Sequence, residues 1–386
     1  MHRKLTALII SISALTSAHA ATELYGSLQL GMTRLDKQGL AIEDYGSYIG
    51  LRGSESLGEN TQLIFNLRWA FNAADGGENG EGFENEIAMI GLETSAGTFA
   101  IGRMENPFYD VVKADSVSDD FNALGLSASA AAAGDILLGN AGSINTFDAE
   151  IWEYLGNAAI YTSPTFAGLS FTAGIVASND EEIYGNNRGA NLYTISLTYE
   201  HESGFYSRLG YFSADLADDA KRAYSYGAQV GFRTEDWGIT TNYAYAKNKG
   251  ADNFGIGNVH SEFFWNQIKD QSTDNNDYKH TAKGWDIGAY WAFGSDHDTT
   301  LRATYGQATA KKRHTGLDNL NHAIRNQEDN RLKTFSIGLE QELSERTAIW
   351  VEYQHNVVKQ KFAMDQGVSS RKFKDDQLSI GIRHDF

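Results

Sequence analysis

Short segments in which apolar and polar residues alternate recur from residue 22 to the end of the chain. In residues 22–35, Leu24, Leu28, Leu30 and Met32 share one parity, while Tyr25 and small or polar residues hold the other. A period of two indicates a β-strand with one apolar face. The same alternation returns in residues 47–54, 62–71, 205–212, 223–233 and 299–308. The sequence therefore predicts an all-β protein.

The connections between these segments alternate between short and long. Short turns are expected at residues 57–60, 94–97, 162–168, 201–204, 234–238, 294–298 and 343–346, and longer connections lie between them. Antiparallel barrels of bacterial outer membranes have short periplasmic turns, long external loops and an even number of strands. The pattern predicts such a transmembrane barrel with about sixteen strands.

The last strand runs to the final residue of the sequence. In residues 377–386, Leu378, Ile380 and Ile382 lie on the same face as the terminal Phe386. Pairing of this strand with residues 22–35 would close the sheet and remove both of its edges, as a lipid environment requires. We therefore expect Phe386 to take part in closing the barrel.

One interval, residues 104–156, is much longer than the others. It contains Asp110, Asp115, Asp119 and Asp120 near its start and an alanine-rich stretch at residues 127–133. A connection of this length without strands of its own is usually functional. We predict that it folds into the lumen of the barrel and narrows it. For residues 127–155 the pattern leaves open a helix in the pore or a cap over its mouth.

The first twenty residues have the features of a cleaved export signal. Arg3 and Lys4 precede an apolar run at residues 5–15, and Ala18-His19-Ala20 has the small-x-small pattern of a cleavage site. We expect cleavage after Ala20. Residues 21–386 contain no linker-like segment, so they are predicted to form a single domain.

Composition and charge narrow the classes of function. The chain has 39 Gly, 19 Tyr and 20 Phe, as suits a barrel with aromatic girdles, and no Cys, which excludes disulfides and thiolate metal sites. The formal net charge of −18 becomes −20 without the signal, which argues against a nucleic-acid partner. The sequence shows no catalytic motif, metal-ligand spacing or phosphate-binding loop, so no catalytic residue and no cofactor are expected. The acidic residues 274–277 do not fit a calcium-binding loop and are interpreted as a solvated segment.

Five stretches resemble the Gram-negative general porins. Residues 21–26 (ATELYG) are similar to the start of the mature family sequence, and residues 47–58 (SYIGLRGSESLG) to its second strand and first turn. Residues 101–103 (IGR), 161–169 (YTSPTFAGL) and 382–386 (IRHDF) resemble the strand before the constriction loop, the turn after it and the family C-terminus. All five occur in the family order over nearly the whole mature chain.

The resemblance implies a sixteen-stranded, homotrimeric diffusion porin in the outer membrane, surrounded by lipid and lipopolysaccharide. Small hydrophilic solutes and ions would cross it through a pore narrowed by the third external loop. Two departures leave the ion preference open. Tyr48 stands where family members commonly carry a basic residue, and the interval between Arg103 and Tyr161 is longer than usual.

Candidate pore residues follow from parity and from the resemblance. Arg52, Arg68 and Arg103 are predicted to face the lumen in neighbouring strands, with Tyr48 beside them on the pore wall. The four aspartates of residues 110–120 are the expected partners on the constriction loop. Opposed rows of cations and carboxylates would create a transverse field that sorts ions by sign. The alternatives are ordinary interior charges of a wet barrel and a solvated acidic loop.

Two further classes of function remain as alternatives to a channel. An outer-membrane enzyme of the lipid-hydrolase type would need a Ser/His/acid set on the outer wall. A soluble secreted β-protein, such as a glycan-binding module, would not need detergent for extraction.

Overall fold

The structure is a computed structural model. It describes residues 21–35, 39–75, 82–137, 153–177, 192–214, 221–249, 277–294, 297–317, 323–364 and 367–386. The predicted signal at residues 1–20 lies outside the described residues, as do residues 138–152 and 274–276.

The described elements are strands apart from two helices within the long interval. The strands are β1 (Ala21–Leu35), β2 (Gly39–Asp44), β3 (Tyr48–Gly58), β4 (Thr61–Ala70), β5 (Glu84–Thr94), β6 (Gly97–Glu105), β7 (Tyr154–Thr162), β8 (Leu169–Val176), β9 (Leu192–Glu200), β10 (Phe205–Ala214), β11 (Lys221–Arg233), β12 (Trp237–Lys249), β13 (Asp277–Phe293), β14 (Thr299–Leu317), β15 (Ala323–Ser344), β16 (Thr347–Met364) and β17 (Gly367–Asp385). The helices are α1 (Pro107–Val112) and α2 (Ala128–Leu137). Neither helix is long and apolar enough to cross a membrane.

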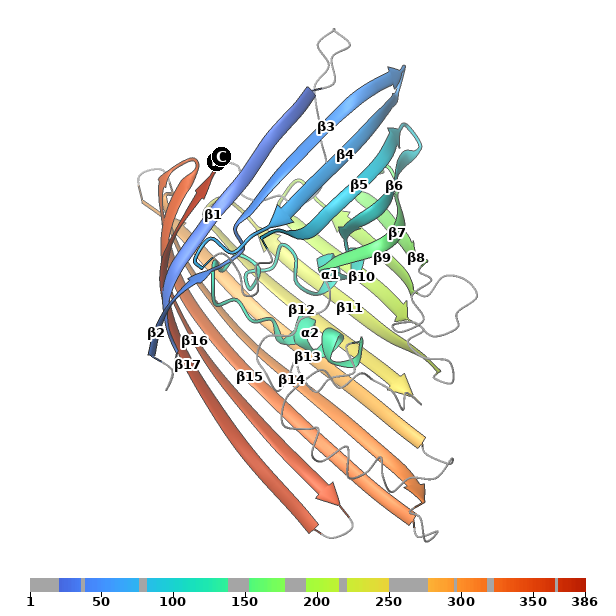
Figure 1. Ribbon diagram of the computed structural model, residues 1–386, viewed down its shortest axis with the longest axis vertical. Helices are drawn as coiled ribbons and strands as arrows, with labels where there is room; N and C mark the ends of the chain where they lie inside the picture. The colour runs from blue at the N-terminus through green and yellow to red at the C-terminus, as the bar shows by residue number, and fades with distance from the viewer. Residues whose placement is uncertain are drawn as a thin grey trace.

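All strands belong to one antiparallel sheet that closes on itself (Figure 1). Each strand pairs with its neighbours in sequence, and β1 pairs with β17. Both β2 and β3 pair with β1, on either side of a break at residues 45–47, so they form one interrupted strand. The barrel therefore has sixteen strand positions, and the all-β, sixteen-stranded prediction is confirmed.

The closing contact involves both ends of the described chain. The register runs from Ser27 opposite Asp385 to Leu35 opposite Gln377. Beyond Ser27, Gly26 and Phe386 exchange two backbone hydrogen bonds of 3.0 Å each. The ring of Phe386 lies over Gly26, and a Cβ at Gly26 would overlap it. Glycine is therefore needed at this position for the terminal ring to pack against the first strand.

The two faces of the barrel differ in chemistry. Large apolar side chains such as Leu24, Trp291 and Ile380 are 57%, 57% and 51% exposed and point outward, because they alternate with buried neighbours. Inward positions carry buried polar residues such as Gln229 and Asn356. An exposed apolar outer surface around a polar interior is the arrangement that a barrel in lipid requires.

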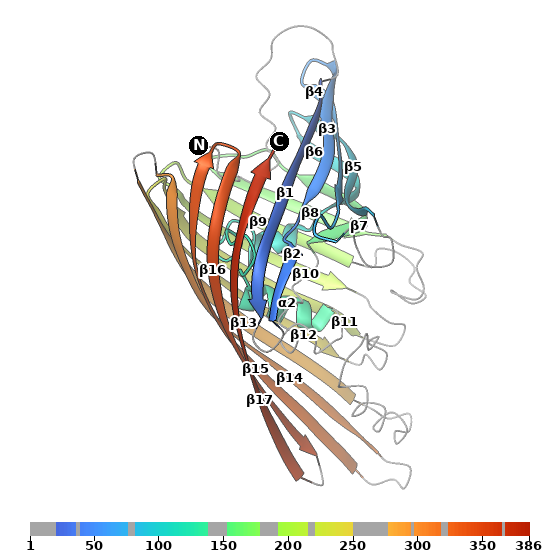
Figure 2. The same ribbon diagram turned by 60° about the vertical axis from the view of Figure 1, so that its left-hand side comes forward.

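Strand length divides the barrel into a short and a long side. β14–β17 contain 18 to 22 residues each, whereas β3–β8 contain 8 to 11. Short turns join the strands at the end where Phe386 lies, and β14–β17 extend far in the other direction (Figure 2). The helices α1 and α2 lie within the ring of strands.

Candidate functional site

Residues 106–137, here called the internal segment, follow β6 and cross the inner face of the barrel (Figure 1). Asn106 caps α1, because its side-chain oxygen accepts a 3.0 Å bond from the N–H of Phe108 and Pro107 occupies the first turn. The helix α1 contacts β8–β12, and α2 contacts β11–β15. The alanine-rich stretch thus begins as a helix against the wall, and residues 138–152 lie outside the described part of the chain.

Small residues on the wall allow this close approach. A Cβ at Gly210 would lie 2.8 Å from the Val111 side chain, and one at Gly288 would lie 2.6 Å from that of Val117. A Cβ at Gly284 would overlap the carbonyl of Ala128 at the start of α2. Glycine at these wall positions therefore lets the segment pack directly against the backbone of the strands.

Four inward arginines hold the first half of the segment. Arg208 on β10 forms a 2.5 Å ion pair with Asp115, and Arg233 on β11 forms a 2.8 Å ion pair with Asp120. Arg302 on β14 donates to the carbonyl of Asp120. The fourth is Arg383 on β17, which donates to the side-chain oxygen of Asn122 at 2.5 Å. These bonds fix residues 115–122 along the wall from β10 to β17.

Two wall carboxylates hold the segment by its backbone. Glu352 on β16 accepts the N–H groups of Asn122, Ala123 and Leu124 at 2.7, 2.8 and 2.9 Å. Asp286 on β13 accepts the N–H groups of Ala128 and Ser129 at 2.6 and 2.8 Å.

Asp286 also accepts the hydroxyls of Ser127 and Ser129. It therefore caps the N-terminus of α2, where unpaired N–H groups and the helix dipole favour an anion.

Arg68 and Tyr48 lie together on the part of the wall that the segment leaves uncovered. Arg68 forms a 2.6 Å ion pair with Glu86 and donates to the Tyr154 hydroxyl at 2.8 Å. Its guanidinium carbon is 4.2 Å from the centre of the Tyr48 ring, a cation–π distance. The ring of Tyr48 thus packs against a positive charge.

Arg52 and Arg103 each have partners of their own. Arg52 stacks over Tyr25 and forms a 2.7 Å ion pair with exposed Glu23, so its charge is offset by a carboxylate. Arg103 follows Gly102, whose φ is +128°, and its guanidinium carbon is 5.8 Å from the centre of the Tyr154 ring. Its Nε donates to the carbonyl of Asn85 at 2.8 Å. Tyr154 also accepts a hydrogen bond from the inward Arg68, so the two guanidinium groups lie on the same side of the sheet, and the expected lumen position of Arg103 stays a prediction.

Asp110 and Asp119 lie on the segment outside the strands. Burial raises the pKa of Asp110 to about 7, with neighbouring Asp115, Asp119 and Glu153 acting in the same direction and Arg208 against it. Burial also raises the pKa of Asp119 to about 6, although the ammonium of Lys113 opposes the shift. Both carboxyls therefore change charge between neutral and mildly acidic pH.

Two of the four aspartates form ion pairs with the wall that the segment covers. Asp115 and Asp120 bind Arg208 and Arg233 and are therefore not ion-pair partners of the arginines on β3, β4 and β6. The alternating pattern already places Arg208, Arg233 and Arg302 at inward positions. Parity was therefore the signal that could have identified them, but it does not reveal which wall the segment covers.

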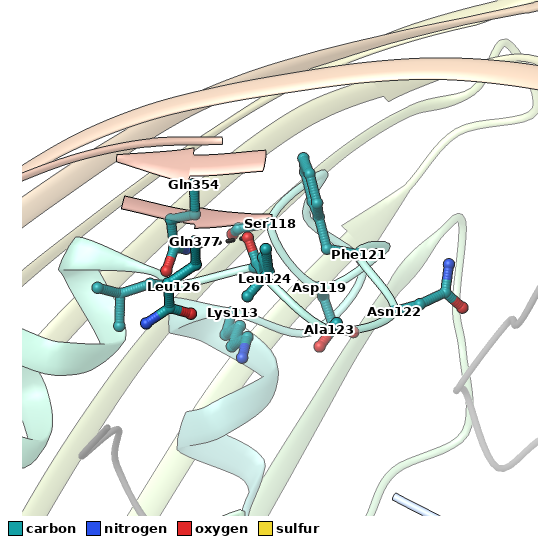
Figure 3. Close-up of a pocket in the computed structure, with 11 residues that line it drawn as sticks. Lys113, Ser118, Asp119, Phe121, Asn122, Ala123, Leu124, Leu126, Gln354 and Gln377 are labelled. Atoms are coloured by element: carbon teal, nitrogen blue, oxygen red, sulfur yellow. Dashed lines mark hydrogen bonds between the residues drawn. The ribbon is translucent and has the colours of Figure 1, made fainter. Parts of the chain in front are cut away.

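A recess of about 390 Å³ opens between the segment and the wall (Figure 3). Lys113, Asp119 and Phe121 of the segment line it, together with Gln354 and Gln377 of the wall. Two charges of the segment and two amides of the wall thus line one recess. Across the described ranges, no group of three or more His, Asp or Glu side chains could hold a metal ion.

We expect Gly284→Val to displace α2 from the wall, since the new side chain would overlap the backbone of Ala128. The chain has no cysteine, so Ala131→Cys, at a fully buried position, provides a single thiol. Maleimide labelling of this thiol should be at least about tenfold faster with Gly284→Val. A decrease of about 1.4 kcal/mol in the free energy of detaching α2 from the wall raises the detached population tenfold. Gly82→Val, at a position with open space, serves as control. Equal labelling rates in the two variants would contradict the packing described.

The fold defines the class of protein: a membrane-spanning antiparallel β-barrel with a polar lumen and an internal segment bound to its wall. Sequence comparison then identifies the family. The profile of the Gram-negative porins matches residues 5–361, so the chain belongs to that family. This membership and the closed barrel locate the protein in the Gram-negative outer membrane.

Individual relatives agree with this assignment. The major outer membrane protein P.IA of Neisseria meningitidis serogroup C is 28% identical over 222 residues, which cover 48% of this chain and 56% of the relative. P.IB of Neisseria lactamica is 28% identical over 220 residues, covering 53% and 57%. The chain thus spans just over half the length of these curated relatives.

Solved structures share the fold at low identity. An anion-selective porin from Comamonas acidovorans superposes with a TM-score of 0.63 at 17% identity, over 95% of this chain and 100% of the other. Salmonella typhi OmpF, in complex with daunomycin, superposes with a TM-score of 0.60 at 15% identity, over 95% and 97%.

Proposed function

We propose that the protein forms a water-filled channel through which small hydrophilic solutes and ions diffuse passively across the outer membrane. The observation that carries this proposal is the closed barrel whose outer face is apolar and whose inner face is polar. Membership of the porin family supports it. No catalytic step and no cofactor are part of the proposal.

The internal segment is the proposed constriction. It lies along the wall from β8 to β17 and presents Lys113 and Asp119 to the recess, whereas Arg68 lies on the uncovered wall. Charges of opposite sign on the two sides of an aqueous pore create a transverse field, which orients polar solutes and sorts ions. We infer that Arg68, which stacks on Tyr48 and is paired with Glu86, is a cationic group of the pore wall, together with Arg52 and its partner Glu23.

Assembly is proposed by comparison. One structural neighbour is a Vibrio cholerae outer membrane protein, OmpT, in a trimer form, at 13% identity and a TM-score of 0.60. The exposed apolar outer face of this barrel must contact lipid or other copies. We propose a homotrimer with outer-membrane lipid and lipopolysaccharide around it.

The two alternative functions receive less support. An outer-membrane lipid hydrolase would share the barrel, but the family assignment favours a channel. A soluble glycan-binding protein would have to leave the many exposed apolar side chains of the outer face in water. Extraction in buffer without detergent would establish the soluble alternative.

We expect Arg68→Gln to shift the reversal potential towards cations in planar bilayers with a salt gradient, because one pore-wall cation is lost. The triple variant of Arg52, Arg68 and Arg103 should shift it further in the same direction, since it removes two more positive charges. Under the same conditions the unmodified protein should show discrete conductance steps, grouped in threes if it is a trimer.

Arg346→Gln is the matched control for charge, because Arg346 lies in an exposed turn between β15 and β16. It should leave the reversal potential unchanged. An unchanged potential in Arg68→Gln would remove Arg68 from the conducting path, and the absence of any conductance steps would overturn the channel itself.

A further inference from the structure

The outer part of β17 has an edge that no described strand covers. β17 pairs with β16 from Gly367 onwards. Its pairing with β1 begins only at Gln377, which lies opposite Leu35 at the end of β1. Among the described residues, no backbone hydrogen bond outside the strand pairs involves residues 367–376. We call residues 367–376 of β17 the free edge.

The free edge exists because β1 is shorter than the hairpin of β16 and β17. β1 ends at Leu35, and the next strand, β2, pairs with β1 from Gly39 to Asp44. The hairpin of β16 and β17 continues well past the end of β1 (Figure 1). At about 3.4 Å per residue, the free edge is roughly 30 Å long.

The hydrogen bonds at the closing contact show which backbone groups of β17 face this edge. The N–H and C=O of Phe386 bond Gly26 of β1, whereas the N–H of Asp385 bonds the carbonyl of Arg346 beside β16. The register of β17 has no shift, so the direction alternates along the strand and the even-numbered residues face β1. Beyond the end of β1, these even-numbered residues are Val368, Ser370, Lys372, Lys374 and Asp376. Their N–H and C=O groups therefore point to the free edge.

The free edge is open on both faces of the sheet as well as along its side. Residues 367–374 are all exposed. On the neighbouring strand β16 the inner face is covered, since Val358 is 0% exposed, whereas Phe373 opposite it on β17 is 43% exposed. The covering of the inner wall therefore ends at β16, and β17 is accessible to an added strand.

Positive charge is concentrated around the free edge, although the chain has a net charge of −18. Arg371, Lys372 and Lys374 lie on the edge, and Lys359 of β16 lies opposite Lys372. Among the ion pairs between described residues, none involves any of these cations. The two acidic residues of the edge, at positions 375 and 376, lie at its base beside the closed part of the barrel.

These charges decide which kind of strand fits the free edge. Lysines on an exposed edge oppose pairing with an identical edge, because like charges on neighbouring strands are destabilising. The same lysines favour a strand of opposite charge. Lys372 and Lys374 are two residues apart and therefore project from one face of the sheet. Acidic residues at alternate positions of an added strand would stand beside them.

We propose that the free edge binds an extended acidic segment of a partner protein, which adds to the sheet as a further strand beside β17. Backbone hydrogen bonds to the N–H and C=O groups of the edge supply affinity, and the charge pattern supplies specificity. The free edge lies at the end of the barrel opposite Phe386 and the short turns, which is the external side (Figure 1). The partner is therefore a protein that reaches the cell surface.

The test measures binding of a fluorescent peptide of alternating Glu and Thr, as long as the free edge, to the detergent-solubilised full chain. Ser370→Pro removes one N–H group from the free edge and leaves the ladder with β16 intact, because Ser370 faces away from β16. Lys372→Gln combined with Lys374→Gln removes two charges. We expect each variant to raise the apparent dissociation constant about tenfold or more, and the effect of the lysine variant to shrink at high salt.

Two controls separate strand addition from simple attraction between charges. Lys311→Gln combined with Arg313→Gln removes the same charge from exposed positions of β14, which has a paired strand on both sides. β14 is roughly 14 Å from β17, beyond the screening length at physiological salt, so this variant should leave peptide binding within about twofold. A peptide of equal charge in which two Thr are replaced by Pro should bind at least about tenfold more weakly to the unmodified protein, because Pro has no N–H to donate. All variants should keep the heat-modifiable mobility of a folded barrel.

Equal affinity for the two peptides would overturn the proposal, as would equal binding by the lysine variant and its charge control. A change of oligomeric state in Ser370→Pro, with no peptide binding by the unmodified protein, would assign the edge to a contact between copies of the chain and would also overturn it. The proline peptide and the lysine variant decide the matter even if Ser370→Pro does not fold. Peptide binding does not depend on conduction, so these outcomes are separate from those for the channel.

Discussion

Replacing Glu352 by glutamine is expected to loosen the internal segment and to change conduction more than any single charge on the open wall. The carboxylate accepts three backbone N–H groups, from Asn122, Ala123 and Leu124, and it is only 1% exposed. Glutamine is nearly isosteric but retains one acceptor oxygen and presents an NH₂ group to donors that cannot pair with it. Hydrogen bonds to a charged partner contribute about 1.5–3 kcal/mol each. We therefore expect the attachment of residues 122–124 to the wall to be weakened by several kcal/mol.

The measurement combines single-channel recording with labelling of a single cysteine. Glu352→Gln should give larger or more variable open steps, and Leu124→Cys, at a buried position, should react faster with maleimide in that background. Glu328→Gln is the control, since Glu328 is also buried on the inner wall but accepts from Asn330 of its own strand. Steps and labelling rates identical to those of the control would show that Glu352 does not position the segment.

Lowering the pH from about 8 to about 5 is expected to shift the ion preference of the channel towards anions. The pKa of Asp110 is raised to about 7 and that of Asp119 to about 6, in both cases chiefly by burial. Above these values both carboxyls are charged and favour cations. As the pH falls through about 7 and then about 6, each carboxyl takes up a proton and loses its negative charge. The positive charges of the pore remain, so the balance moves towards anions.

The reversal potential across a fixed salt gradient, recorded at intervals of half a pH unit, measures this shift. Asp110→Asn combined with Asp119→Asn should be anion-shifted already at pH 8 and should show a flatter pH profile. Asp75→Asn, on an exposed connection, is the control and should keep the original profile. A profile for the double variant that parallels the unmodified protein would mean that other groups carry the titration.

The sequence by itself determined the barrel. Alternation over strands such as residues 22–35 and 299–308 has one solution in lipid, because a side-chain period of two assigns each residue to one of two faces. The terminal run of Leu378, Ile380, Ile382 and Phe386 likewise specified a strand that pairs with the first one and closes the sheet. These patterns are local, and the tertiary structure leaves them unchanged.

Only the tertiary structure decided what the internal segment touches. The bonds of Arg208 with Asp115 and of Glu352 with Asn122 join residues 93 and 230 positions apart. Parity gives each arginine a face but no partner, because all inward positions of a barrel are equivalent until the segment is placed across some of them. Whether Arg68 or Arg208 stays free of the segment is therefore a property of the closed barrel, in which strands distant in sequence surround one lumen.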